Sequence, residues 1–249
     1  VAFVDEDAIV DKYFSVNIVK VFNENKDVNC IGGKIHLLNK ENSFATIIQK
    51  SIFSYQMKSS KAVIGTNMAF RKSLFVSIGG FIPEFTYRGD ESAFFKKAKG
   101  FIHIRTSKDV VVIHPQPDSF KKWIKTRYEN GFYSAAIDSI PEFEKVIVYK
   151  RLLLSITSLI SPLIALLLIN MFCCISMGIV TFYVILLLKR FVINRTLRNI
   201  LSTYSSNIND TISVKNIIYV CYIFITGSYA EDYGYICGYR KYYDYHWRI

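Results

Sequence analysis

The residues best suited to chemistry are acidic side chains that directly follow a strand-like run. Asp5 and Asp7, separated by one residue, come after the hydrophobic residues 1–4 at the start of the 249-residue chain. Carboxylates at the C-terminal end of a strand lie where α/β sheets bind ligands. Two of them can hold a hard divalent cation such as Mg or Mn, and through it a diphosphate. A solvated acidic turn is the alternative interpretation.

A second acidic pair, Asp90-Glu91, precedes a short helix-like stretch that ends at Gly100. The pair suits a helix start, with Asp90 as N-cap and Glu91 in the first turn. His114 ends a β-rich run, as a structural histidine at a strand end would.

The elements that must position these residues alternate between two patterns over residues 1–115. Strand-like runs are predicted at 1–4, 29–38, 61–70, 101–105 and 110–114, the first of them buried and the second with a bulge or turn at Gly32-Gly33. Helical spacing is predicted at 11–25, 43–58, 72–78 and 90–99. Strands that alternate with helices predict an α/β domain with a largely parallel sheet.

Four blocks in this region resemble the family 2 glycosyltransferases, which have the GT-A fold. VAFVDEDA at residues 1–8 resembles the family's strand and DxD motif. GTNMAFRKSLFVSIGGF from Gly65 resembles its segment with a Gly-x-Asn-x-x-x-Arg core. YRGDESAFFKKAKG resembles its acidic acceptor-site motif, and VVVIHP the following strand with a terminal histidine. The resemblance covers residues 1–115 and has the blocks in the family's order.

The resemblance implies an enzyme that moves a sugar from a nucleotide-diphosphate sugar to an acceptor hydroxyl. It implies a divalent cation, Mg or Mn, that neutralises the leaving diphosphate and is held by Asp7, with Asp5 assisting and His114 nearby. It also places Gly65, Thr66 and Asn67 along the donor sugar pocket. The acceptor is expected to be lipid-linked or a cell-surface glycan.

The acidic motif departs from the family's usual pattern, which is Glu-Asp or Asp-Asp with the second residue as base. Here it reads Gly89-Asp90-Glu91. By register Glu91 is the base that inverts the anomeric centre, but Asp90 is the motif's only aspartate, so the assignment stays open between them. The departure supports an alternative function: a catalytically degenerate, membrane-anchored glycan-binding or scaffold protein of the same fold.

The family's first strands, which hold the nucleotide base, are expected upstream of Val1. We therefore expect a GT-A domain that lacks its first strands, and a chain that is inactive by itself. Processive members carry Gln-x-x-Arg-Trp, whereas Gln116, Trp123 and Arg127 are spaced differently here, which argues against a polymer synthase. Trp123 and Arg127 remain weak acceptor-site candidates, and a helix-face anchor is the alternative for Trp123.

Residues 152–188 contain no Asp, Glu, Lys or Arg, and this run predicts transmembrane helices. Basic clusters on both sides favour a hairpin with both ends in the cytoplasm. A buried helix of a soluble protein is the alternative. Residues 216–230 form a weaker apolar segment, for which an interfacial or re-entrant helix is favoured over a span.

These patterns predict four regions. They are a partial GT-A domain at 1–117, an amphipathic helical connection at 118–150, a transmembrane hairpin at 151–190 and a cytoplasmic or interfacial tail at 191–249. The expected location is the cell membrane, multi-pass, with the catalytic domain in the cytoplasm. The net charge of +11 is spread along the chain rather than gathered in one arm, which argues against a nucleic-acid partner.

Overall fold

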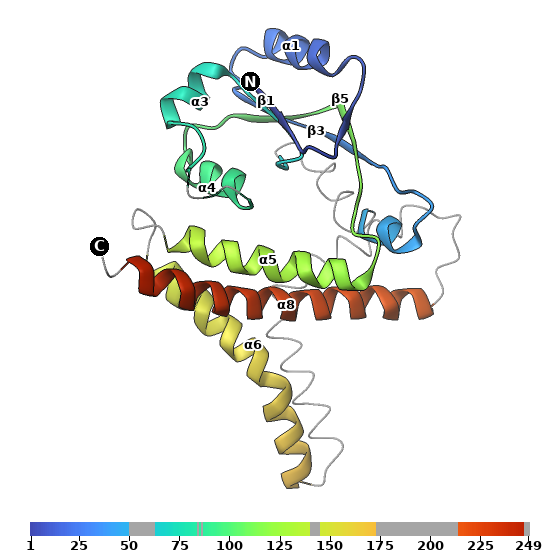
Figure 1. Cartoon of the computed structure of the whole chain (residues 1–249), viewed down its shortest axis with the longest axis vertical. Coiled ribbons are helices and arrows are strands. Elements are labelled where there is room, and N and C mark those ends of the chain that lie inside the picture. Colours follow the sequence, from blue (N-terminus) through green and yellow to red (C-terminus); the bar gives the residue numbers. More distant parts are fainter. Residues whose placement is uncertain (50–62, 84, 86, 140–144, 173–213, 247–249) are drawn as a thin grey trace. The chain divides into compact units, whose positions relative to one another are not determined.

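The computed structural model describes residues 1–249 except 50–62, 84, 86, 140–144, 173–213 and 247–249. The chain divides into two compact units, Val1–Phe120 and Lys121–Ile249. The first unit holds the sheet and the second is helical in its described part (Figure 1). Each unit is described by itself below.

A five-stranded sheet forms the centre of the first unit, in the order β1-β4-β3-β5-β2. The strands are β1 (Ala2–Val4), β2 (Ile9–Val10), β3 (Cys30–Leu37), β4 (Asn67–Phe70) and β5 (Ile104–His114). Only the β3–β5 pair is parallel, and the other three described pairs are antiparallel. The prediction of a largely parallel sheet is therefore wrong. Helical and strand-like patterns locate elements, but pairing direction depends on contacts that are distant in sequence.

The sheet must curl because β1 and β2 are consecutive in the chain but lie at opposite ends of the strand order. Residues 5–8 join them through a turn in which the Ala8 amide donates to the Asp5 carbonyl at 3.1 Å. Such a turn spans less than about 7 Å, so the link from Val4 to Ile9 reaches about 15 Å at most. Four strand spacings in a flat sheet amount to about 19 Å. The short link therefore draws the two edges together.

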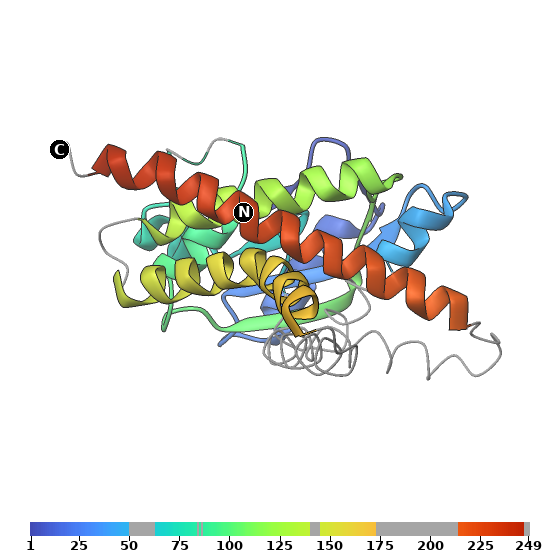
Figure 2. The ribbon, with the colours of Figure 1, turned by 90° about the horizontal axis from the view of Figure 1, so that it is seen from below.

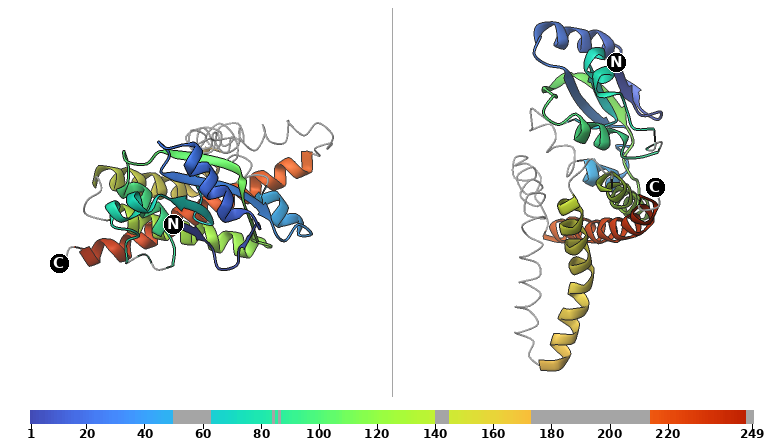
Figure 3. Two further views of the ribbon diagram at one scale, coloured as in Figure 1. Left: turned by 90° about the horizontal axis from the view of Figure 1, so that it is seen from above. Right: turned by 90° about the vertical axis from the view of Figure 1, so that its left-hand side faces the viewer.

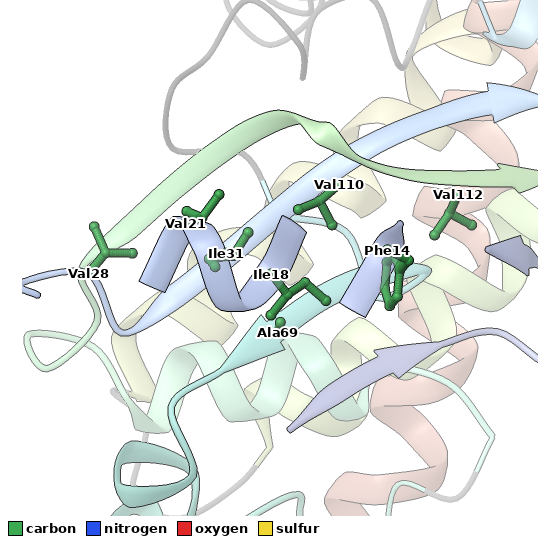
Figure 4. Packing of buried hydrophobic residues seen from close by; sticks show 8 residues of the cluster. All are labelled: Phe14, Ile18, Val21, Val28, Ile31, Ala69, Val110 and Val112. Atoms are coloured by element: carbon green, nitrogen blue, oxygen red, sulfur yellow. The ribbon is translucent and has the colours of Figure 1, made fainter. Parts of the chain in front are cut away.

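The helix α1 (Phe14–Glu24) covers one face of this sheet. Its Phe14, Ile18 and Val21 recur at helical spacing and are buried. Figure 4 shows them packed on residues of β3, β4 and β5 in one cluster, whose members are Phe14, Ile18, Val21, Val28, Ile31, Ala69, Val110 and Val112. This burial fixes α1 on the sheet.

The opposite face is covered by α3 (Lys72–Ile78) and α4 (Asp90–Lys97). Figures 1 and 3 show α1 and α4 on opposite sides of the strands. Phenylalanine rings pack against one another on this face, for example Phe70 and Phe94 with ring centroids 4.9 Å apart. The buried residues of this cluster are Cys30, Met68, Phe70, Leu74, Phe94 and Ala98. The C-cap of α3 is Gly79, whose φ of 88° is the left-handed conformation that glycine adopts without strain.

The strand β1 differs from its prediction as a buried strand. It lies at one end of the strand order, and Val1 and Val4 are exposed. The predicted bulge at Gly32-Gly33 is present, as a register shift between Gly33 and Lys34 of β3. The two β-rich runs at 101–105 and 110–114 form the single long strand β5.

The second unit contains α5 (Phe120–Asp138, whose first residue belongs to the first unit), α6 (Lys145–Phe172) and α8 (Val214–His246). Figures 1 and 2 show α5 and α8 side by side. Glycines allow this approach: a Cβ at Gly131 would collide with the Glu231 carbonyl, and one at Gly234 with the Tyr128 carbonyl. Gly238 meets the Phe132 carbonyl in the same way. Gly227 meets Trp123 near the start of α5, and Gly238 meets Phe132 further along, so the two helices run in the same direction.

The membrane predictions are corrected by the structure. Within the described residues, none of the helices has the length and apolarity needed to cross a membrane. This contradicts the C-terminal transmembrane helices, the multi-pass cell-membrane location and the membrane role of 151–190 in its described part. Residues 173–190, the second half of the predicted hairpin, lie outside the described residues, and 216–230 lies within α8.

The prediction counted missing charges, but an uncharged residue is not always apolar. The helix α6 carries Ser155 and Ser158, and both are buried. Their hydroxyls donate to the Asp232 carboxylate of α8 at 3.1 and 2.6 Å. This part of the uncharged run therefore serves polar contacts between helices.

Candidate functional site

Pairing between β1 and β4 places Asp5 beside Thr66. Val4 pairs with Asn67 in an antiparallel ladder, so the next residue of β1 faces the residue before Asn67. The Thr66 hydroxyl donates to Oδ2 of Asp5 at 2.7 Å. Thr66 is 7% exposed, which makes it a buried support for a half-exposed carboxylate.

Pairing between β2 and β5 brings Asp7 to the end of β5. Ile9 pairs with Ile113, so the turn at residues 5–8 passes over His114. Nε2 of His114 lies 3.3 Å from Oδ2 of Asp5 and 3.2 Å from Oδ1 of Asp7. The three candidate ligands are therefore neighbours: Asp5 and Asp7 lie in the link between β1 and β2, and His114 lies at the end of β5.

The three side chains form a group that could hold a metal ion. One ligand atom from each lies within 4.8 Å of the other two. The hydrogen bond with His114 holds the pKa of Asp5 below its usual value, and the Thr66 hydroxyl and the charges of His114 and Arg88 act in the same direction against burial. An ionised carboxylate is the form that binds a cation. Two oxygens and one imidazole nitrogen suit divalent transition metals as well as Mg, so the donor set does not identify the ion.

Glu91 lies in the first turn of α4. A Cβ added to Gly65 would lie 3.2 Å from Cδ of Glu91, so the carboxylate packs against this glycine. Burial raises the pKa of Glu91 to about 7, and the neighbouring Asp90 and the charge of Asp5 add to the rise. A carboxylate with that pKa can accept or give a proton near neutral pH. Asp90 begins the same helix.

Asn67 and Arg71, which belong to the Gly-x-Asn-x-x-x-Arg core of the Gly65 block, bond to backbone. Nδ2 of Asn67 donates to the carbonyls of Lys34 and Val110 at 3.0 and 3.1 Å, across the bulge between β3 and β5. Asn67 is 1% exposed. The Arg71 guanidinium donates to carbonyls at the end of α1 and just after it: Phe22 at 2.6 Å, Asn25 at 3.1 Å and Val28 at 2.7 Å.

Trp123 and Arg127, the acceptor candidates, make their described contacts inside the second unit. The Trp123 indole is 3% exposed and donates to the Ile223 carbonyl at 3.2 Å. Arg127 forms an ion pair with Glu231 and lies over the Trp123 ring. Burial lowers the pKa of Arg127 to about 10. These contacts agree with the alternative of a helix-face anchor.

Sequence reasoning missed two features of the site. Arg88 is close enough to Asp5 to lower its pKa, and its position directly before Gly89-Asp90-Glu91 was the available signal. The bond from Thr66 to Asp5 had no local signal, because it depends on strand register over 61 residues. No protein-family model and no curated protein matches this chain.

Proposed function

We propose that the unit Val1–Phe120 carries the catalytic site of a glycosyltransferase. The reaction moves a sugar from a nucleotide-diphosphate sugar to a hydroxyl group of a glycan acceptor and inverts the anomeric centre. The observation that carries this proposal is the pairing of two acidic sites within one small region. Asp5, Asp7 and His114 form a potential cation site, and Glu91 has the pKa of a base for neutral pH.

Asp7, Asp5 and His114 are the residues that would hold a divalent cation. When bound, the ion supplies positive charge that stabilises the diphosphate leaving group. Arg88 adds a fixed positive charge near Asp5. The resemblance to family 2 glycosyltransferases supports the same assignment from the sequence motifs.

Glu91 is the proposed general base. Its carboxylate takes the proton of the acceptor hydroxyl as the hydroxyl oxygen attacks the anomeric carbon on the face opposite the diphosphate. Because Glu91 must be ionised to accept this proton, activity should rise with pH up to about 7 and then level off. Asp90 tunes Glu91 through its hydrogen bond and charge.

A transfer assay on the full-length protein tests the proposal. Purified protein is incubated with Mn²⁺ or Mg²⁺, a panel of nucleotide-diphosphate sugars and glycan acceptors, and release of nucleoside diphosphate is measured. We expect EDTA and Asp7→Asn to abolish transfer and Glu91→Gln to slow it by about 10²–10⁴-fold. Asp90→Asn should be tolerated.

Transfer that continues undiminished in EDTA, or that survives both Glu91→Gln and Asp90→Asn, would overturn the proposal. Metal-dependent binding of a donor sugar or glycan without any turnover would instead favour the degenerate glycan-binding or scaffold alternative.

A further inference from the structure

The turn before β4 contacts a residue of each acidic site. The Asn67 amide donates to the Ile64 carbonyl at 2.9 Å, which closes a four-residue turn with Gly65 and Thr66 at its centre. The side chain of Asn67, the last residue of the turn, donates to backbone carbonyls of β3 and β5. The end of the turn that follows Gly65 and Thr66 is therefore anchored to the sheet.

Each central residue of this turn meets one carboxylate. Thr66 donates its hydroxyl to Asp5 at 2.7 Å. Gly65 presents its bare Cα to Glu91, and an added methyl group would lie 3.2 Å from Cδ and 3.5 Å from Oε1 of that residue. The first contact fixes a carboxylate of the potential cation site, and the second gives room to the proposed base.

We propose that the Gly65-Thr66 turn is the positioning element of the acidic site. Thr66 orients Asp5 toward the cation, and Gly65 allows Glu91 its place beside the backbone. The turn thus sets the separation between the leaving-group side and the base side of the reaction. This inference rests on the proposed function, and it gives Thr66 a role through Asp5 rather than through a donor sugar hydroxyl.

The Thr66 contact is tested by metal affinity, which needs no turnover. Mn²⁺ binding to the full chain is measured by electron paramagnetic resonance. Thr66→Val keeps the shape and removes the hydroxyl, and we expect affinity to fall by about 10-fold, as for other residues that orient metal ligands. Thr66→Ser should restore it. Thr46→Val is the matched control, because the Thr46 hydroxyl bonds to the Lys40 carbonyl elsewhere in the same unit.

The Gly65 contact is tested by measuring both Mn²⁺ affinity and kcat, and here only kcat should change. Gly65→Ala should leave Mn²⁺ affinity unchanged but lower kcat for transfer by about 10- to 100-fold, because the displaced base no longer meets the acceptor proton. In a Glu91→Gln background the same substitution should have no further effect on kcat, since both changes act through one residue.

The outcomes separate the two proposals. If the wild-type protein binds no Mn²⁺, the proposed function fails and the positioning role fails with it. If wild type binds but Thr66→Val binds equally well, or if Gly65→Ala lowers kcat equally in the Glu91→Gln background, only the positioning role is overturned.

Discussion

Glu91 illustrates how a catalytic group can reduce stability. Its pKa is raised from 4.5 to about 7 by burial, so the folded state holds a proton that the unfolded state has lost between those pH values. The unfolded state then binds fewer protons, and the free energy of unfolding falls as pH rises from about 4.5 to about 7. The ionised form that a base requires is thus the less stable form.

The first prediction follows from this sign. Glu91→Gln should increase the free energy of unfolding by about 1–3 kcal/mol at pH 8, and the gain should shrink toward zero below about pH 4.5. Urea unfolding at several pH values measures it. Glu24→Gln, at an exposed position of α1, serves as the control. A gain that does not depend on pH would contradict the assignment of a raised pKa.

Arg71 shows that a motif residue can serve the fold. Its guanidinium satisfies three carbonyls at and after the end of α1 and lies over the Phe22 ring. The arginine therefore links the start of α3 to the end of α1.

The second prediction concerns this link. Arg71→Leu should reduce the free energy of unfolding of the first unit by about 2–4 kcal/mol, because three partly buried carbonyls lose a charged donor. Arg105→Leu is the matched control: Arg105 is exposed and donates to the Asn25 side chain at 2.6 Å, so its loss should cost less than about 1 kcal/mol. If the two substitutions reduce the free energy of unfolding equally, measured by thermal or urea unfolding, Arg71 does not stabilise the link between α1 and α3.

At the scale of elements, the bulge between β3 and β5 depends on the side-chain amide of Asn67. A Cβ at Gly33 would collide with Nδ2 of Asn67 and with the Val110 carbonyl, so the glycine makes the space that Asn67 fills. The amide then bonds to both strands.

The third prediction replaces this donor by an acceptor. Asn67→Asp places a buried carboxylate against two carbonyls and should destabilise the first unit by about 3–5 kcal/mol. Asn23→Asp is the control, because Asn23 is exposed on α1 and the same change there should cost less than about 1 kcal/mol. Chemical unfolding at pH 7 measures both. A small effect of Asn67→Asp would mean that the bulge relaxes.

The fourth prediction concerns the α5–α8 contact. Gly234→Ala forces a methyl group against the Tyr128 carbonyl, which is helix backbone and cannot rotate away. We expect the second unit to lose about 3 kcal/mol or more. Thr226→Ala is the control, because the Thr226 hydroxyl bonds within α8. Unchanged stability of Gly234→Ala would show that the helices separate without cost.

For the whole molecule, the last prediction is that a substitution in one unit destabilises mainly that unit. The units Val1–Phe120 and Lys121–Ile249 each have their own set of internal contacts. Arg71→Leu should therefore increase amide hydrogen exchange mainly in the first unit, and Gly234→Ala mainly in the second. Hydrogen-exchange mass spectrometry of the full chain measures this. Equal loss of protection in both units from either substitution would show one cooperative unit.

The sequence by itself determined most element positions in the first unit. Helices at 14–24 and 72–78, the strand at 30–37 and the bulge after Gly33 follow from spacing and glycine placement, which are local properties. It also selected Asp5 and Asp7, because acidic residues after a strand-like run are visible in the linear sequence, whereas His114 was selected through the resemblance to family 2 glycosyltransferases.

Only the tertiary structure decided how these elements pair. Strand direction, the curl of the sheet and the contact of Thr66 with Asp5 depend on residues far apart in the chain, so no local pattern reports them. The same limit explains the membrane correction. A run without charges specifies neither which serines will be buried nor what they will meet, and the partner of Ser158 is Asp232, 74 residues away.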